Sequence, residues 1–167
     1  MKIGLLSDTH SHLDENIFNY FSGCDEIWHA GDIGNMELLE KLEAFKPLVA
    51  VWGNIDGHQV RAATHEAVFF EREGKKIYMI HIAGKPPGYN PRLKTMLNKY
   101  QPDILVCGHS HVLKIQKDHA RNLLFINPGA AGIHGFHQVK TIVRFDINDR
   151  VISNMEVIEL GKRGKLS

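Results

Sequence analysis

The sequence predicts a single α/β domain in which two packed sheets are covered by helices. Its 167 residues are enough for one domain with a sizeable buried core. Over the first half, strand-like runs alternate with helix-like runs, which is typical of a mostly parallel sheet. Over the second half, apolar runs separated by turn residues indicate further, mainly antiparallel strands. We expect the domain to span residues 1–160 and a polar tail to occupy residues 161–167.

The first half of the chain predicts strands and helices in alternation. Strands are expected over residues 2–6, 26–28 and 48–52. Helices are expected over residues 12–21 and 36–45, because apolar side chains recur there at helical spacing. Asn35, or Gly34 before it, is expected at the start of the second helix.

The second half predicts a hairpin, a loop, a helix and several strands. Residues 67–72 and 75–80 flank Glu73-Gly74, which indicates a hairpin. Glycine and proline place a loop at residues 84–91, before a helix over residues 92–100. The remaining strands are expected over residues 104–107, 112–116, 123–126, 139–145 and 151–159, with a turn at Asn148-Asp149.

Composition and charge exclude several classes of protein. The apolar fraction of 43% and the charged fraction of 23% exclude a disordered or collagen-like chain. The net charge of +1 gives no strong attraction to nucleic acid or to an anionic membrane. Cys24 and Cys107 alone build neither a disulfide framework nor a thiolate metal site, which fits a reducing compartment. No signal peptide or membrane-spanning stretch is recognisable, so we expect a cytoplasmic protein.

Polar residues at the ends of five predicted strands carry the main functional signal. The chain contains 11 histidines, and histidine is the commonest metal ligand in proteins. Ligands of α/β sheets bind in the crevice beyond the carboxyl ends of the strands. The side chains that the strand ends offer to this crevice are Asp8, His10, Asp32, Asn54, His81, His109 and His111.

The chemistry of these side chains points to a metal site. Carboxylate, amide and imidazole groups suit manganese, iron, zinc and nickel. Seven ligands exceed the needs of one ion with an open position, but they suffice for two ions if one carboxylate bridges. Two ions about 3.5–4 Å apart can activate a water molecule and clamp both oxygens of an in-line displacement at phosphorus.

The chain resembles the calcineurin-like metallophosphoesterases, because it carries their motifs in order. These motifs are Asp8-Thr9-His10, Gly31-Asp32, Gly53-Asn54, His81 and Gly108-His109-Ser110-His111. The short length and the segment Asn127-Pro128-Gly129-Ala130 resemble the small prokaryotic phosphodiesterase branch, to which the retromer subunit Vps29 is related. The resemblance implies a four-layer α/β/β/α sandwich of two mixed sheets and a centre of two divalent ions, with manganese expected and zinc, iron or nickel as alternatives.

The resemblance also implies a role for each residue of the motifs. The first ion would be held by Asp8, His10 and His111, and the second by Asn54, His81 and His109, with Asp32 bridging both. A water or hydroxide between the ions would attack phosphorus in line. The catalytic part of the site would comprise Asp32, Asn54, His81 and His109. His29 would help to orient the ligands.

The sequence departs from the family pattern at two positions next to the ligands. Many relatives carry a histidine directly after the motif asparagine, placed to protonate the leaving group, and this chain has Ile55 there. Many relatives also continue His81 as His-Gly-His, whereas this chain reads His81-Ile82-Ala83. A general acid contributes about 10²–10⁴-fold, so its absence favours substrates with activated leaving groups or shifts the role to another residue.

Other polar and aromatic residues have ordinary structural interpretations. His12 is expected to line the cleft or begin a helix, and His134 and His137 to line the cleft or lie exposed in a glycine-rich loop. Asp56 is expected to be a hydrogen-bonding turn residue, and Tyr89 an exposed loop residue. The residues expected at the surface are His58, His65 and His119, and those expected in the core are Trp28, Trp52 and Cys107.

The function that we expect is hydrolysis of a small phosphodiester. A phosphomonoesterase is the close variant. A non-catalytic interaction module of the Vps29 type is the alternative from another class, although the full ligand set speaks against it. A nuclease would need a basic face, for which the candidates are Lys75, Lys76, Lys85, Arg92, Lys94 and Lys99. Self-association of small relatives makes a homodimer an open expectation.

Overall fold

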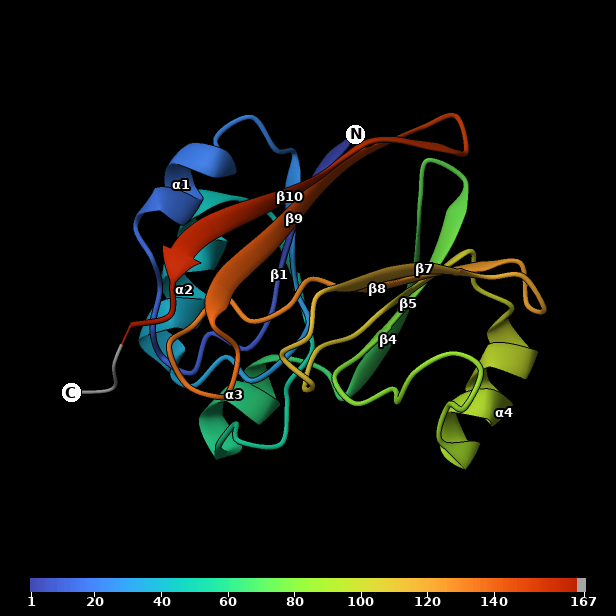
Figure 1. Cartoon of the computed structure of the whole chain (residues 1–167), viewed down its shortest axis with the longest axis horizontal. Helices are drawn as coiled ribbons and strands as arrows, with labels where there is room; N and C mark the ends of the chain where they lie inside the picture. The colour runs from blue at the N-terminus through green and yellow to red at the C-terminus, as the bar shows by residue number, and fades with distance from the viewer. Residues whose placement is uncertain (165–167) are drawn as a thin grey trace.

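The computed structural model describes residues 1–164 and shows two five-stranded sheets packed face to face. Helices cover the outer face of each sheet, with α1, α2 and α3 on one side and α4 on the other (Figure 1). The chain thus forms a single α/β domain with the layers α/β/β/α, which confirms the predicted fold.

Both sheets are mixed. In the first sheet β1, β2 and β3 run parallel, and β9 is antiparallel to β1 and β10. Its strands, in spatial order, are β10 (Val151–Lys162), β9 (Val139–Asn148), β1 (Lys2–Leu6), β2 (Glu26–His29) and β3 (Leu48–Ala50). In the second sheet β5, β6 and β8 run parallel between antiparallel edge strands. Its strands, in spatial order, are β4 (Ala67–Arg72), β5 (Lys75–Ile80), β6 (Ile104–Val106), β8 (Leu123–Asn127) and β7 (Lys114–Asp118).

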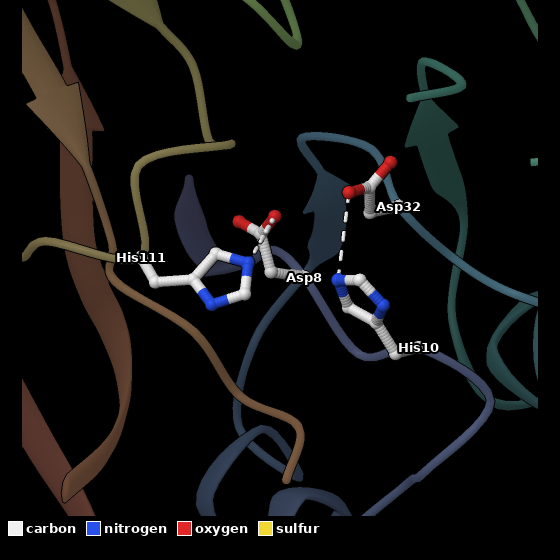
Figure 2. A group of neighbouring side chains, drawn as sticks. All are labelled: Asp8, His10, Asp32 and His111. Atoms are coloured by element: carbon white, nitrogen blue, oxygen red, sulfur yellow. Dashed lines mark ion pairs between the residues drawn. The ribbon is translucent and has the colours of Figure 1, made fainter. Parts of the chain in front are cut away.

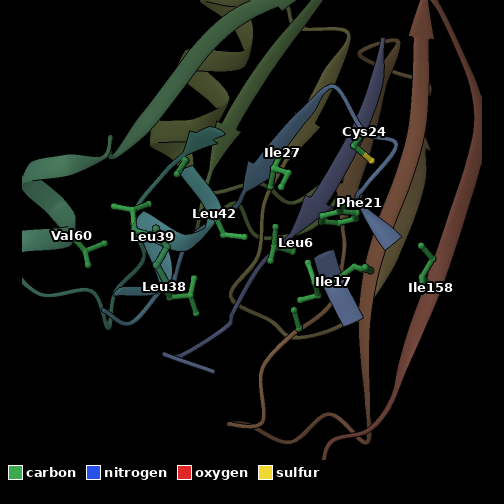
Figure 3. Close-up of a cluster of buried hydrophobic side chains, with 14 residues drawn as sticks. Leu6, Ile17, Phe21, Cys24, Ile27, Leu38, Leu39, Leu42, Val60 and Ile158 are labelled. Atoms are coloured by element: carbon green, nitrogen blue, oxygen red, sulfur yellow. The ribbon is translucent and has the colours of Figure 1, made fainter. Parts of the chain in front are cut away.

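Side chains on the two faces of β1 pack into two separate hydrophobic cores. Ile3 and Leu5 point into the core between the sheets, whereas Leu6 joins the core under the helices. Figure 3 shows Leu6 in that outer cluster with Ile17 and Phe21. A third cluster lies between the second sheet and α4. The two outer cores fix the helices on the sheets, and the central core fixes the sheets on one another.

The helices within residues 1–164 are α1 (Asn16–Tyr20), α2 (Met36–Phe45), α3 (His58–Ala63) and α4 (Pro91–Tyr100). Asn35 caps α2 as predicted, because its side chain accepts a hydrogen bond from the Leu38 N–H. No helix in this part of the chain is both long and apolar enough to cross a membrane.

The structure differs from the prediction around α1 and α3. The helix predicted over residues 12–21 begins only at Asn16, since the Asp14 carboxylate accepts the Asn16 backbone N–H at 3.1 Å and forms a turn instead. The short helix α3 was not predicted. The turn of the last hairpin is Asp149-Arg150 rather than Asn148-Asp149, with φ values of 45° and 65°.

The predicted boundary of the domain at residue 160 is too early. β10 continues to Lys162, which pairs with Val139 of β9. The Arg163 side chain then donates hydrogen bonds to the carbonyls of His137 and Ile133. Residues 161–163 therefore belong to the folded domain, and residues 165–167 of the predicted tail lie outside the described residues.

Candidate metal centre

The carboxyl ends of five strands place the predicted ligands in one crevice. Asp8 and His10 follow β1, Asp32 follows β2, and His81 follows β5. The loops after β3 and β6 carry the others, which are Asn54, His109 and His111. The structure thereby brings together residues that are up to about a hundred positions apart in the sequence, such as His109, whose backbone N–H lies 3.1 Å from Asp8 Oδ2.

The ligand atoms form two groups that share one carboxylate. Asp8, His10, Asp32 and His111 each offer an atom within 4.8 Å of the others, and Asp32, His81 and His109 do the same. Figure 2 shows the first group, in which the two carboxylates face the two imidazole rings. Two adjacent groups with one shared aspartate are the arrangement that a pair of bridged ions requires.

Within these groups, the distances between imidazole nitrogens and carboxylate oxygens are long enough for a metal ion to lie between the two atoms. His111 Nε2 lies 3.2 Å from Asp8 Oδ1, and His10 Nε2 lies 3.4 Å from Asp32 Oδ2 (Figure 2). His81 Nε2 lies 3.3 Å from Asp32 Oδ1 and 3.9 Å from Asp8 Oδ1. Ring nitrogens and carboxylate oxygens therefore converge on common points from several directions.

Two buried nitrogen atoms test whether these residues fit a metal ion. Within residues 1–164, Nε2 of His10 and Nε2 of His81 are buried and have no hydrogen-bond partner. Buried polar atoms almost always have a partner, so atoms of this kind indicate a place where a ligand binds. His81 Nδ1 lies 2.8 Å from the Ala30 carbonyl and donates to it, which leaves the Nε2 lone pair facing carboxylate oxygens. A cation between them satisfies both groups, so the residues fit a metal.

The protonation equilibria agree with this fit. Burial lowers the pKa of His10 despite the nearby carboxylates, which keeps its ring neutral and able to coordinate. Burial raises the pKa of Asp32, but His81, the Ile55 N–H and His10 together lower it more, so the pKa lies below its usual range and the group is a carboxylate. Burial also lowers the pKa of His81, but Asp32, Asp8 and the Ala30 carbonyl together outweigh this and raise it, because the nearby carboxylates favour positive charge.

Left-handed backbone conformations are concentrated at the predicted ligands. Positive φ angles occur at Asp8, His10, Asp32, His109 and His111, with values of 55°, 46°, 55°, 72° and 58°. Each non-glycine residue in this region costs about 1 kcal/mol or more, although Asp and His tolerate it better than most. A Cβ on Gly53 would collide with the Asp32 carboxylate, and one on Gly31 would collide with the His81 ring. The loops thus accept strain and crowding in order to direct these side chains inward.

Asn54 lies at the open side of the site. Its side chain is exposed and lines, together with His81, a pocket of 310 Å³. The next residue, Ile55, donates its backbone N–H to Asp32 Oδ1 at 3.1 Å. The β3 loop therefore borders the same pocket as His81, and the role of Asn54 as a ligand stays a prediction.

Buried polar residues behind the ligands order the loops. His29 Nδ1 accepts the Gly31 N–H at 3.2 Å, and its Nε2 lies 2.9 Å from Thr9 Oγ1. Burial lowers the pKa of His29 to about 4, so the ring is neutral. His29 thus contacts the Gly31 backbone and the Thr9 side chain, which are next to Asp32 and Asp8, rather than a ligand side chain.

Asp56 and Asn127 order further loops. Asp56 is the hydrogen-bonding turn residue that was predicted, but it also joins two loops, because its carboxylate accepts from Gly53 N at 2.8 Å, Gly34 N at 2.7 Å and Ile33 N at 3.1 Å. Asn127 donates to the Gly108 carbonyl at 2.9 Å. These contacts across the fold have no signal in the sequence beyond the residue types.

Two further histidines line the first group of ligands. His134 stacks on His10 with ring centroids 5.6 Å apart, and His137 meets the His111 ring edge-on at 5.2 Å. Both therefore line the cleft, which was one of two expectations for them. His12 lines a separate pocket with Glu37 and Lys41. The three histidines expected at the surface are exposed, namely His58, His65 and His119.

The predicted environment of two aromatic residues is wrong. Tyr89 is buried rather than exposed, since its hydroxyl donates to the buried Asp118 at 2.9 Å and its ring lies in the core under α4. Trp52 lines the 310 Å³ pocket instead of the core, and the Arg61 guanidinium covers its ring at 4.3 Å. Trp28 and Cys107 are buried as expected.

Comparison with known proteins agrees with the geometry. Residues 1–150 match the model of the calcineurin-like phosphoesterase superfamily domain. A probable metallophosphoesterase of Methanocaldococcus jannaschii is 31% identical over 165 residues, which cover 95% of this chain and 82% of the relative. A phosphodiesterase of the same organism is 25% identical, over 77% of this chain and 83% of the relative.

Solved structures share the fold at lower identity. An archaeal phosphodiesterase superposes with a TM-score of 0.77 at 22% identity, over 96% of this chain and all of that one (100%). Chaetomium thermophilum Vps29 also gives a TM-score of 0.77, at 16% identity, over 96% of this chain and 97% of that one. The two groups of ligands at the strand ends therefore occur in a chain whose sequence matches one family over most of its length, and this protein belongs to the calcineurin-like phosphoesterase superfamily.

Proposed function

We propose that the protein is a divalent-metal-dependent phosphodiesterase. The observation that carries the proposal is the pair of ligand groups that share Asp32 and contain two buried imidazole nitrogens with no hydrogen-bond partner in residues 1–164. In this proposal Asp8, His10 and His111 hold one ion, and Asn54, His81 and His109 hold the other, with Asp32 bridging. Manganese is the expected metal, with zinc, iron or nickel as alternatives that a site of this donor set also accepts.

The residues of the chain prepare the site for this chemistry. Two divalent ions, when bound, supply Lewis acidity toward a phosphate group and an activated water nucleophile. Asp32 stays ionised because its pKa is lowered, so it can balance positive charge between the two groups. The His109 N–H fixes the Asp8 carboxylate and the Ile55 N–H fixes that of Asp32. The two carboxylates are thereby held in place before a metal ion or a substrate binds.

Apolar side chains around the site support a diester rather than a monoester substrate. Ile55, Ile82 and Val112 follow three of the proposed ligands and are 43%, 42% and 60% exposed. Apolar surface at the mouth of a pocket favours organic substituents on the phosphate. Ile55 has no proton to give to a leaving group, so the best substrates should carry leaving groups of low pKa.

The experiment that tests this function compares a chromogenic phosphate diester with its monoester. We would strip the protein of metal, restore Mn²⁺, and compare the wild type with Asp32→Asn, which keeps the shape but removes the bridging charge. We expect Mn²⁺-dependent cleavage of the diester, with activity lost in the variant. A wild type that binds metal and cleaves neither substrate contradicts the proposal.

An interaction module is the second candidate, because the fold is also that of Vps29. Phe136, in the loop beside His134 and His137, is fully exposed at 104%. An exposed aromatic side chain of this kind is a candidate contact for a protein partner. Metal binding without turnover, together with a partner that covers the crevice, would favour this candidate. A nuclease is less well supported, because Arg92 pairs with Glu66 and Lys75 with Asp103.

We also propose a cytoplasmic location, a small phosphodiester as the substrate, and a homodimer. Cys24 and Cys107 are free and buried, which suits a reducing compartment. Sedimentation equilibrium of the metal-loaded protein tests the homodimer: a mass near 19 kDa, against the chain mass of 18.9 kDa, contradicts it.

A further inference from the structure

Two pockets adjoin the second group of ligands, and Ile82 lines both of them. The first, here called the Trp52 pocket, has a volume of 310 Å³ and is lined by Trp52, Asn54, Arg61, Ile80, His81 and Ile82 among others. The second, here called the Val112 pocket, has a volume of 540 Å³ and includes Ile82, Ala83, Lys85, His109, Val112 and Phe125. Each pocket thus contains at least one proposed ligand of the same ion.

The two pockets lie close to a common point. The rings of His81, in the Trp52 pocket, and His109, in the Val112 pocket, are 5.3 Å apart between centroids. Both histidines also contribute to the group that contains Asp32. A phosphorus atom held at this group therefore has one pocket on the His81 side and another on the His109 side.

The wall between the pockets is fixed by the capping residue of α4. Asn90 Nδ2 donates to the Ile82 carbonyl at 3.2 Å, and Asn90 N donates to the Ala83 carbonyl at 3.4 Å. The Asn90 side chain also caps α4 by accepting the Leu93 N–H at 2.8 Å. The Ile82 side chain is 42% exposed although its backbone is held in this way. Ile82 is therefore an apolar divider on a fixed backbone rather than part of the core.

We propose that the two pockets receive the two arms of a phosphodiester, with Ile82 as the residue that selects for substituents on both sides. This inference rests on the proposed function. Both volumes fall within the range of about 300–1,000 Å³ that small-molecule sites occupy. A diester has two substituents that diverge from phosphorus, whereas a monoester fills one pocket only.

The linings indicate the chemistry of the arms. The Trp52 pocket offers an indole ring and Ile80, and the Arg61 guanidinium that covers the ring is already held by the Asp56 carbonyl at 2.6 Å. The Val112 pocket offers the exposed side chains of Val112 and Ile82 as apolar surface. The substrate class is therefore an organic phosphodiester with an apolar body, such as an aryl group, on each side.

The test uses two diesters that share a leaving group. Bis(p-nitrophenyl) phosphate has two large arms, and methyl p-nitrophenyl phosphate has one. In each case water adds to phosphorus, the bond from phosphorus to the nitrophenyl oxygen breaks, p-nitrophenolate departs with the electron pair, and the water proton passes to solvent. The variants are Ile82→Ala, which removes three carbon atoms from the divider, and Val112→Trp, which fills one pocket. Val151→Ala is the matched control, because Val151 is β-branched, 61% exposed and outside both pockets.

We expect both test variants to lower the ratio of kcat/KM values between the two-armed and the one-armed diester about tenfold, mainly through KM. The control should keep the wild-type ratio. Ratios within twofold of the wild type in both test variants, while hydrolysis continues, overturn the two-arm placement and leave the proposed function standing.

A binding measurement separates the two possible failures. Diphenyl phosphate should change the fluorescence of Trp52, the other tryptophan being the fully buried Trp28, and the response should weaken several-fold in Ile82→Ala. A binding response without hydrolysis of either diester by the wild type supports the pockets and contradicts the proposed function. A wild type without any fluorescence response overturns the inference even if it hydrolyses both substrates.

Discussion

Asp56 joins the loop that carries Asp32 to the loop that carries Asn54, and its removal gives a sharp test of how the site is held. Its carboxylate is buried and accepts three backbone N–H groups, at distances of 2.7, 2.8 and 3.1 Å. Hydrogen bonds to a charged group contribute about 1.5–3 kcal/mol each. Three of them give an upper range of about 5–9 kcal/mol, and entry of water would recover part of it.

We therefore expect Asp56→Ala to lower the free energy of unfolding by about 3–5 kcal/mol. Asp56→Asn should cost less, because one carbonyl acceptor remains. Urea denaturation at pH 7 in the presence of a chelator measures both variants without any contribution from metal. Asp25→Asn is the matched control: it removes a charge that accepts a single, exposed backbone N–H from Lys2.

The same variants should weaken metal binding, since loops that are no longer joined must be ordered when the ion binds. Isothermal titration with Mn²⁺ measures this effect. A loss of stability below about 1 kcal/mol in Asp56→Ala would refute the reasoning, because it would mean that the three N–H groups find equal partners elsewhere.

Three other outcomes follow from the structure. Saturation with Mn²⁺ at about a hundred times its dissociation constant should stabilise the fold by about 2.7 kcal/mol and raise its Tm, and an unchanged Tm at that concentration would show that the folded state gains nothing from the metal. The pKa of His29 is lowered to about 4 in the fold against 6.5 for a free histidine, so the unfolded chain binds a proton that the fold refuses. Stability contributed by neutral His29 is therefore present above pH 6.5 and lost as the pH falls from 6.5 toward 4, by up to about 3 kcal/mol. In urea denaturation with a chelator present, the free energy of unfolding of His29→Gln should lack this part of the dependence on pH. Gly4→Ala should cost about 1–3 kcal/mol, because its Cβ would lie 2.7 Å from the Phe21 ring. Gly23→Ala should be near neutral in the same denaturation assay, because its Cβ would meet no atom of the described residues within 4 Å.

The sequence predicts the positions of the ligands because two simple patterns coincide there. Buried strands appear as apolar runs, and the ends of parallel strands meet at one edge of a sheet. Asp8 and Asp32 each lie two or more residues beyond the end of a predicted strand. The strand assignment alone therefore predicts that the two side chains lie close together. The roles of the individual ligands depend on the family resemblance and stay predictions until metal is bound.

Other features could not be predicted because they depend on contacts across the fold. Asp56 and Asn127 look like ordinary loop residues, and only the assembled structure brings backbone donors and acceptors to them. The late start of α1 reflects competition between a side-chain turn at Asp14 and helical apolar spacing, which periodicity does not register. Tyr89 illustrates the same limit, since its burial depends on Asp118, nearly thirty residues away in sequence.

The backbone of the site bears on the choice between an enzyme and a scaffold. Five proposed ligands adopt left-handed conformations, and at about 1 kcal/mol each the total is about 5 kcal/mol. A domain of this kind is stable by only about 5–15 kcal/mol, so the strain is a large fraction of its stability. Nε2 of His10 and Nε2 of His81, which find no hydrogen-bond partner within residues 1–164, add to that cost. A surface that only docks a partner needs neither the backbone strain nor the unpartnered nitrogens. Two ions bound between the strained residues would offset both of these free-energy costs. The geometry of the chain therefore favours a crevice that binds metal, as the proposed function requires.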